Sequence, residues 1–142
     1  MENYFLLDIH SEAQKKIAGK WLALAVASLL AAGVFSLLLV LSRTPGVQNI
    51  IPWVDFFHVA LVVHVDLSVL IWFLSMAGVF WTLSNPKSGG LLDKSAWLLS
   101  ALGALLMVTC PFFGVGNPLM NNYVPVLQHP VYYLALGLFA AG

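Results

Sequence analysis

The chain has 142 residues, of which 61% are hydrophobic and only 8% are Asp, Glu, Lys or Arg. A soluble domain carries about a quarter of its residues as charged side chains, so this chain cannot cover itself with a water-compatible surface, and we expect lipid to solvate much of it. The formal net charge is zero, which gives no electrostatic reason to expect nucleic acid as a partner. Cys110 is the only cysteine, which excludes an internal disulfide and a multi-cysteine metal site.

Residues 1–19 precede any long apolar stretch and are predicted to form a cytoplasmic or interfacial segment. Acidic residues come before any basic one, which is not the pattern of a removable signal peptide. Apolar residues from Phe5 to Ile9, set among charges, favour a short helix at the membrane surface. His10 lies in this solvated segment and receives no functional role.

Three long apolar stretches predict transmembrane helices, because about 20 apolar residues cross a bilayer as a helix. They cover about residues 21–42, 54–83 and 95–113, the last with a bend near Pro111. The second is long for one span and is expected to tilt or to project beyond the hydrocarbon. Small residues that suit close helix packing recur at every fourth position of the first stretch. They form two neighbouring rows, Ala23, Ala27 and Ala31, and Ser28, Ala32 and Ser36.

Turn chemistry separates these stretches: residues 43–46 and 84–90 contain Pro, Gly and polar side chains. Residues 114–128 are predicted to be a connecting segment. Pro130 begins a fourth apolar stretch, and proline is favoured in the first turn of a helix. This stretch reaches only Gly142, which is too short to span the hydrocarbon core. We therefore interpret the sequence as the N-terminal part of a larger membrane protein.

The basic residues predict the orientation. Arg43 is the only one between the first and second stretches, and none lies between the third and fourth. Five lysines lie before the first stretch or between the second and third: Lys15, Lys16, Lys20, Lys87 and Lys94. The positive-inside rule then predicts a cytoplasmic N-terminus. The predicted fold is an all-α membrane bundle with three complete transmembrane helices and the start of a fourth.

The second stretch carries ionisable residues, which are costly inside a membrane and by default mark function. Asp55 is placed near the outer interface, where a charge is cheap. At 100° per residue, Asp55, His58 and Asp66 share one side of the helix. His64 falls on nearly the opposite side, together with apolar or small residues, namely Ala60, Leu61, Leu67, Ser68 and Ile71.

His64 is the candidate cofactor ligand. A neutral imidazole that offers its Nε2 is the usual protein ligand to haem iron, and the small side chains of Ala60 and Ser68 would leave room for a flat cofactor. The competing interpretation is a histidine that forms a hydrogen bond across helices. Asp66 is interpreted either as paired with a polar group on another helix or as part of a proton route. For His58, which lies nearer the membrane interface, a structural role is favoured.

Two further candidates are given structural interpretations. His129 directly precedes Pro130 at the start of the fourth stretch, so a cap or turn residue is favoured over a ligand. Cys110, near the end of the third stretch, is interpreted as a packing residue.

The run His64–Gly78, HVDLSVLIWFLSMAG, resembles helix two of subunit I in the haem-copper oxidase superfamily, which includes cytochrome oxidases and nitric oxide reductases. That helix carries a His, a small or polar residue two positions on, and then a long apolar run with a Gly near its inner end. Residues 122–130 are similar to an outer connection in some bacterial oxidase-type subunits. The resemblance covers about residues 15–142 and implies the first three to four helices of a twelve-helix subunit.

The resemblance implies that His64 is an axial ligand of a low-spin haem and that electrons pass from it to a haem–copper centre, where oxygen is reduced to water with proton translocation. Asp66 departs from the family pattern, and a carboxylate there would tune the haem environment or serve proton movement. The second haem, the copper and their ligands belong to later helices of the family, which this sequence does not contain. The implied partners are other oxidase subunits, an electron donor such as cytochrome c or quinol, and the lipid bilayer of a bacterial plasma membrane.

Two alternatives stay open. A cytochrome b-type electron relay would need a second haem-ligating His on a facing helix, and the first and third stretches contain none. A transporter or structural subunit without haem would use Asp66 and His58 for protons or ions. Bound haem separates the last alternative from the other two, and oxygen consumption separates an oxidase from a relay.

Overall fold

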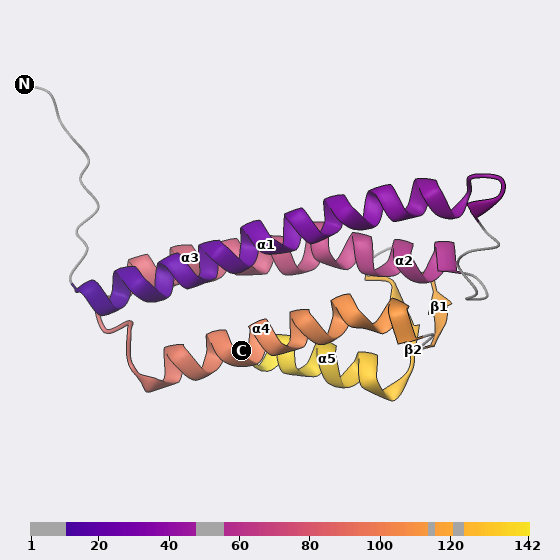
Figure 1. Ribbon diagram of the computed structural model, residues 1–142. Coiled ribbons are helices and arrows are strands. Elements are labelled where there is room, and N and C mark those ends of the chain that lie inside the picture. Colours follow the sequence, from indigo (N-terminus) through magenta and orange to yellow (C-terminus); the bar gives the residue numbers. More distant parts are fainter. Residues whose placement is uncertain (1–10, 48–55, 114–115, 121–123) are drawn as a thin grey trace, which may run out of the picture.

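The computed structural model describes residues 11–47, 56–113, 116–120 and 124–142. Asp55, His10 and the surface helix expected near Phe5 lie outside these described residues. Within them the chain is mostly helical (Figure 1).

The first helix, α1, runs from Glu12 to Ser42. It begins well before residue 21, where the sequence predicted the first span to start, so residues 12–19 are continuous with that helix. Their cytoplasmic or interfacial location stays a prediction. The reason for the early start is local: the Ser11 side chain accepts a hydrogen bond from the backbone N–H of Gln14 at 3.1 Å, and Glu12 lies in the first turn. Both features stabilise a helix N-terminus. A 31-residue helix is about 46 Å long at about 1.5 Å per residue, so its basic first turns extend beyond the hydrocarbon.

The second apolar stretch is one continuous helical rod made of three parts. Helix α2 covers Phe56–Val65, a π-helical segment, η2, covers Asp66–Ile71, and helix α3 covers Trp72–Ser84. The sequence predicted a single helix over nearly these residues but not the π-helical turn. A turn of residues 85–90 follows, in which Gly89 has a φ of +109° that favours glycine.

The third stretch forms α4, Leu91–Thr109, which tightens into a 3₁₀ turn, η3, at Cys110–Phe113. A 3₁₀ turn at a helix end is common, and Pro111 has no N–H to continue the α-helical pattern. The connection predicted for residues 114–128 contains a small antiparallel hairpin: β1, Asn117–Leu119, pairs with β2, Val126–Gln128. Helix α5 then covers Pro130–Ala141 and begins at the predicted residue.

The helices form two antiparallel pairs (Figure 1). Helix α1 lies along the rod of α2, η2 and α3, and α4 lies along α5, with the hairpin at one end of the bundle. The main core lies between the two pairs, and its most buried side chains are Phe35, Val62, Val63, Leu67, Ile71, Met107, Leu127 and Tyr132.

Helix α1 buries one narrow face whose residues recur at alternating spacings of three and four: Trp21, Ala25, Ser28, Ala32, Phe35 and Leu39. This spacing is typical of closely packed helix pairs. Ser28 and Ala32 were predicted to pack and are buried, whereas Ala23 and Ala27 of the other predicted row are exposed. On the partner rod, a Cβ added to Gly78 would lie 2.8 Å from the Trp21 ring, so the two helices are in close contact there.

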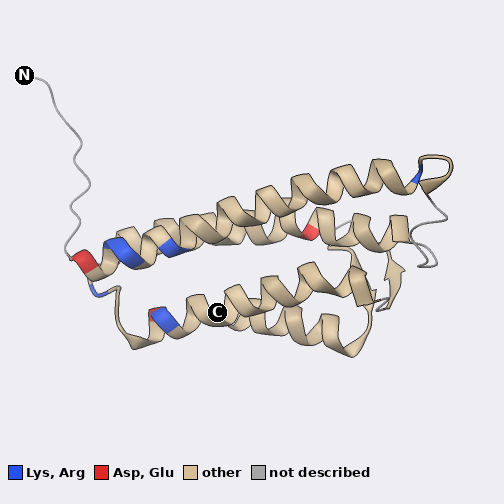
Figure 2. Ribbon diagram, in the orientation of Figure 1, with Lys and Arg blue, Asp and Glu red and all other residues tan. Residues whose placement is uncertain are grey.

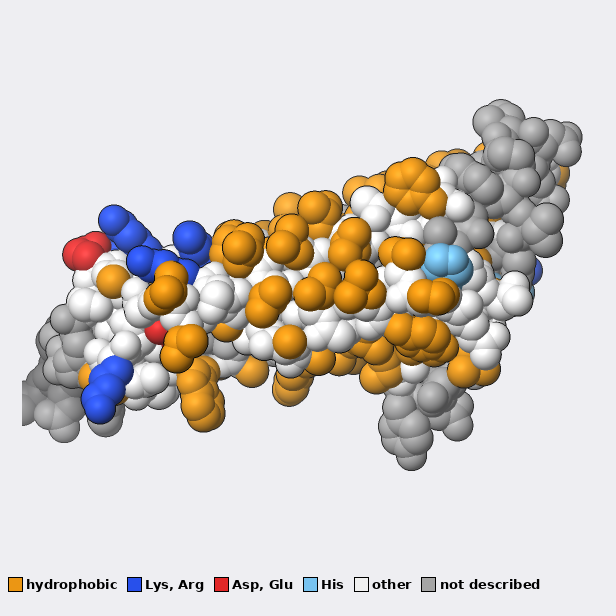
Figure 3. Space-filling model, turned by 90° about the horizontal axis from the view of Figure 1, so that it is seen from below, with side chains coloured by type: hydrophobic (Ala, Val, Ile, Leu, Met, Phe, Trp, Pro, Cys, Tyr) orange, Lys and Arg blue, Asp and Glu red, His pale blue; other side chains and the backbone are white. Residues whose placement is uncertain are grey.

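Three helices of the described residues are long and apolar enough to cross a membrane: Glu12–Ser42, Phe56–Ser84 and Leu91–Phe113. Lysines gather at the end of the bundle where α1 begins and α3 turns into α4 (Figure 2), whereas Arg43 follows the other end of α1. Hydrophobic side chains cover the middle of the face seen in Figure 3. An apolar band with charges confined to its ends is the surface that a bilayer requires.

Candidate functional site

The His64 side chain is held by the backbone of the neighbouring helix. Its Nδ1 lies 2.8 Å from the carbonyl oxygen of Ala32 on α1. A carbonyl oxygen only accepts hydrogen bonds, so Nδ1 must carry a proton, and in the neutral ring Nε2 then keeps its lone pair. A metal-ligating histidine usually donates its other ring N–H to a carbonyl or carboxylate in this way, which fixes the tautomer and the ring orientation. His64 is also partly exposed, so its ring is not enclosed by these helices.

The sequence predicted room for a flat cofactor beside Ala60, on the side of the helix that carries His64, but the structure has no open space at Ala60. Ala60, Leu67 and Ile71 are fully buried in the core, because α1 and the second helix pair cover that face. The open side of the helix next to His64 instead presents Leu61, Val65 and Ser68, all partly buried. The prediction that Ala60 provides room for a cofactor is therefore wrong, while Ser68 remains beside the open side.

The π-helical segment η2 begins at Asp66, two residues after His64. The Ser68 hydroxyl donates to the carbonyl oxygen of His64 at 2.8 Å, and its oxygen also lies 3.3 Å from that of Val65. A π-helical turn leaves carbonyl groups without their normal α-helical partners, and a serine hydroxyl can satisfy one of them. Such single π turns are rare and frequently occur at functional sites. This one begins at Asp66, one of the two ionisable residues that the sequence singled out, and covers the first part of the long apolar run.

Asp66 lies on another side of the same rod and is buried, with 1% of its surface exposed. The hydroxyl of Tyr132 on α5 donates a hydrogen bond to one of its carboxyl oxygens. Of the two interpretations of Asp66, the polar partner on another helix is therefore present. Tyr132 is itself fully buried. The sequence does not single out Tyr132, because a tyrosine in an apolar stretch normally marks a membrane interface and the pair is separated by 66 residues.

The remaining candidates have local roles. His129 is the N-cap of α5, where its Nδ1 accepts the backbone N–H of Val131 at 3.2 Å, so the prediction of a cap residue is confirmed. Cys110 is buried in the core at the end of α4, as expected for a packing residue. The His58 ring packs edge-on against Phe57 with centroids 5.3 Å apart, and the Arg43 guanidinium lies 3.8 Å from the centroid of the same Phe57 ring. The structure does not bring His58 and His64 together on one face.

The donor groups fit one axial haem ligand and do not fit a metal site of several side chains. Among the described residues, no three His, Cys, Asp or Glu side chains come together in a group that could hold a metal ion. A haem iron takes only one or two axial ligands from protein. A histidine with its Nδ1–H donated and its Nε2 available, as His64 is here, has the donor arrangement of such a ligand.

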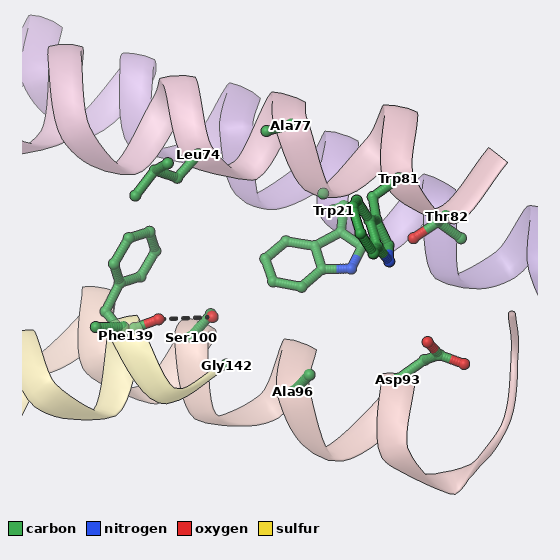
Figure 4. A pocket seen from close by; sticks show the side chains of 12 residues that line it. Trp21, Leu74, Ala77, Trp81, Thr82, Asp93, Ala96, Ser100, Phe139 and Gly142 are labelled. Atoms are coloured by element: carbon green, nitrogen blue, oxygen red, sulfur yellow. Dashed lines mark hydrogen bonds between the residues drawn. The ribbon is translucent and has the colours of Figure 1, made fainter. Parts of the chain in front are cut away.

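Two cavities lie elsewhere in the bundle. One, of about 410 Å³, opens between α1 and α3 on one side and α4 and α5 on the other, where Trp21 and Trp81 face Asp93, Ser100 and Phe139 (Figure 4). The Ser100 hydroxyl there donates to the Phe139 carbonyl oxygen at 3.1 Å (Figure 4). The other, of about 370 Å³, is almost wholly apolar and is lined by Ala27 and Ala31 of α1, Leu67, and α4. Neither is lined by His64 or Asp66.

Comparison with known proteins gives relatives without an assigned activity. An uncharacterized protein of Aquifex aeolicus is 33% identical over 122 residues, which cover 86% of this chain and 31% of the relative. An uncharacterized protein of Rickettsia prowazekii, RP382, is 32% identical over 147 residues, which cover 87% of this chain and 29% of the relative. The chain thus spans about a third of the length of these curated relatives. No family model and no solved structure matches the chain.

Proposed function

We propose that this chain is the N-terminal part of a haem-copper oxidase-type catalytic subunit and that His64 is an axial ligand of its low-spin haem. The observation that carries the proposal is the 2.8 Å contact between His64 Nδ1 and the Ala32 carbonyl oxygen. It leaves Nε2 as the only ring nitrogen able to bind iron, and it holds the imidazole plane on the partly open edge of the α1–α2 pair.

Each neighbouring group has a definite role in this proposal. The Ala32 carbonyl oxygen, as hydrogen-bond acceptor, would fix the tautomer and the orientation of the imidazole as a ligand. The Ser68 hydroxyl is bonded to the helix backbone and does not compete for Nε2. A haem bound there would accept and release one electron at a time, and axial-ligand strength and burial would help to set its reduction potential.

The proposal places other components outside this chain. The second axial ligand, the high-spin haem and the copper would come from the remainder of a larger subunit, which is consistent with relatives about three times as long. Electrons would arrive from a donor such as cytochrome c or quinol. The subunit would lie with other oxidase subunits in a bacterial plasma membrane, with the lysine-rich start of α1 on the cytoplasmic side.

The decisive experiment is a reduced-minus-oxidised visible spectrum of the purified parent protein. We expect a sharp low-spin haem band in the wild type, its loss in His64→Ala, and its retention in His58→Ala and His129→Ala. Because His64→Ala could also disturb folding, His64→Gly provides a second test: added imidazole should restore the band by occupying the vacated ligand position. A wild-type protein without haem, or equal loss in all three alanine variants, would contradict the proposal.

A second candidate function is favoured by one observation, the fully buried Asp66–Tyr132 pair. A carboxyl group inside a membrane helix is a functional group by default, and proton carriers use such residues. A proton-translocating membrane subunit without haem would contain this pair and would give no haem spectrum. Oxygen consumption by a haem-containing parent would in turn separate an oxidase from an electron relay of the cytochrome b type.

A further inference from the structure

An apolar groove of about 370 Å³ lies between α1 and α4, where the two helix pairs face each other. On each of these helices the side chains that line it recur at spacings of three and four, and Leu67 of η2 also lines it. The helix residues of the lining are Leu24, Ala27, Ser28 and Ala31 on α1, and Ala101, Ala104, Leu105 and Val108 on α4. Most of these side chains are small, so neither helix fills the space between the two.

The lining of the groove is almost without polar groups. Its one side-chain hydroxyl, that of Ser28, already donates to the Ala25 carbonyl oxygen at 2.8 Å. A water molecule needs two or more polar partners in such a place, so water is not a suitable occupant. Within a membrane, whatever fills the groove must be apolar along the part that lies between the helices.

Lysines lie at one end of the groove on both helices. At 100° per residue, Lys16 and Lys20 fall on the side of α1 that lines the groove, and Lys94 falls on the corresponding side of α4. All three side chains are exposed. They belong to the lysine-rich end of the bundle (Figure 2). The same faces that line the groove thus continue into positive charge.

The acidic residues that the structure describes at this end, Glu12 and Asp93, do not cancel that charge. Asp93 lines the other cavity, and its Oδ2 accepts the backbone N–H groups of Gly89 and Gly90 at 2.7 and 2.9 Å. Glu12 lies in the first turn of α1, about 12 Å from Lys20 along the helix at about 1.5 Å per residue. A negatively charged group at this end of the groove therefore meets a net positive charge.

A contact between Lys20 and Trp97 marks the depth of this end. The Trp97 indole N–H donates to the Lys20 carbonyl oxygen at 3.0 Å, and the Lys20 ammonium nitrogen lies 4.8 Å from the centroid of the ring. Tryptophan is enriched at the level of the lipid headgroups. From Lys20 to Ala31, and from Trp97 to Val108, each helix advances 11 residues, or about 16 Å at about 1.5 Å per residue. One leaflet, half of a hydrocarbon core about 30 Å thick, has the same depth.

We propose that the groove binds one acyl chain of an anionic phospholipid, whose phosphate lies among Lys16, Lys20 and Lys94. A lipid tail is flexible and apolar, so it can fill the space that the small side chains leave open. Basic pockets between transmembrane helices bind anionic headgroups, and a headgroup without net charge gains less from the lysines. The bound lipid belongs to the leaflet at the lysine-rich end. The site does not involve His64 and is independent of the proposed haem.

Photo-crosslinking of the purified parent protein tests the site. The protein is placed in phosphatidylcholine vesicles that contain a small amount of phosphatidylglycerol with a diazirine in the middle of one acyl chain. Mass spectrometry then maps the labelled residues. We expect label on the facing sides of α1 and α4, at Ala27, Ala31, Ala101 and Leu105. Unlabelled phosphatidylglycerol should compete for these positions, and the same probe with a phosphocholine headgroup should label them several times less.

Substitution of one lysine tests the headgroup end. A lysine near an anionic lipid surface contributes about fivefold to binding, so Lys20→Gln and Lys94→Gln should each lower the labelling by about that factor. Lys15→Gln is the matched control, because it removes the same charge from an exposed position on the opposite side of α1 and should change the labelling little.

Substitution of one alanine tests the acyl-chain end. Ala27→Phe fills part of the groove and keeps every lysine, so it should also lower the labelling. Val26→Phe is the control, because Val26 is exposed on another side of α1 and does not line the groove. The wild-type labelling should persist in this variant.

Equal labelling by the two headgroups, or an equal loss in Lys15→Gln and Lys20→Gln, would overturn the proposal, because the lysines would then not select the lipid. Label that avoids the facing sides of α1 and α4 would also overturn it, since another occupant, such as a further helix of a longer chain, would fill the groove. If Lys20→Gln fails to fold because its contact with Trp97 is lost, Lys94→Gln on the other helix still decides between these outcomes.

Discussion

At the scale of single residues, a few polar contacts across the bundle each join a defined donor to defined acceptors on another helix, which the apolar packing around them does not. Gln14 is fully buried, and its side-chain amide donates to the carbonyl oxygens of Thr82, Leu83 and Asn85 at 3.0–3.2 Å. The last carbonyl groups of a helix have no partner within it. One amide on α1 therefore caps the end of α3.

Replacing Gln14 by Leu should destabilise the protein. The side-chain volume is nearly kept, but the carbonyl oxygens lose the Gln14 amide donor, and only those of Thr82 and Asn85 keep a backbone donor. Leaving a carbonyl group without a partner costs about 1–3 kcal/mol. The midpoint of thermal unfolding in detergent measures the loss. Lys16→Leu introduces the same side chain at an exposed position of the same helix and should change the midpoint little. Equal midpoints for the two variants would show that the cap contributes nothing.

Residue identity alone could predict some of these roles. His129 before Pro130 carries a local signal, since both the cap and the first-turn proline belong to the same few residues. His64 could be selected because a histidine is rare in an apolar helix. Its acceptor, the Ala32 carbonyl oxygen, could not be predicted, since every residue has a carbonyl group and only tertiary packing selects one. Tyr132 could not be predicted either, because nothing near it in the sequence marks it as the partner of Asp66.

At the scale of elements, hydropathy predicted the number of long helices because each must cover the same thickness of hydrocarbon. It could not predict their ends beyond the membrane, and α1 extends through Lys15 and Lys16 because Ser11 caps it further upstream. The π-helical turn at Asp66–Ile71 has no pattern of its own within an apolar run. The two strands of the hairpin are each three residues long, too short to show alternation.

The contact between α4 and α5 depends on Gly103. A Cβ added there would lie 2.5 Å from the Ala135 carbonyl oxygen and from the Phe139 backbone nitrogen, atoms that cannot move without shifting the helix. Gly103→Ala should therefore separate the two helices and cost about 1–3 kcal/mol, measured as a lower thermal midpoint.

Gly137→Ala provides the comparison for Gly103→Ala on the partner helix. A Cβ at Gly137 meets nothing within 4 Å. Alanine is favoured over glycine in a helix by up to about 1 kcal/mol, so this variant should be as stable as the wild type or more so. A destabilised Gly137→Ala with an unaffected Gly103→Ala would mean that the two helices pack differently.

At the scale of the whole molecule, the charged residues that the structure describes lie toward the two ends of an apolar body, apart from the buried Asp66 (Figures 2 and 3). We predict that the lysine-rich end is cytoplasmic, because lysines are retained on that side during insertion. The test uses single cysteines at Lys16 and Thr44 in a Cys110→Ala background, labelled in intact cells with a membrane-impermeant maleimide. Label at position 44 and not at position 16 is the expected result. The opposite pattern would reverse the orientation and place the His64 half of the rod on the cytoplasmic side.

The amide of Gln14 also has a consequence for the order of assembly. It lies 68 residues before Thr82 in the chain, so it cannot reach its acceptors until both spans have left the ribosome. Until then, the Gln14 side-chain amide of the first helix lacks these three acceptors. The second then arrives with carbonyl groups that still need a donor. The first two spans can thus close into this hydrogen-bonded hairpin only after the 84–90 turn has left the ribosome.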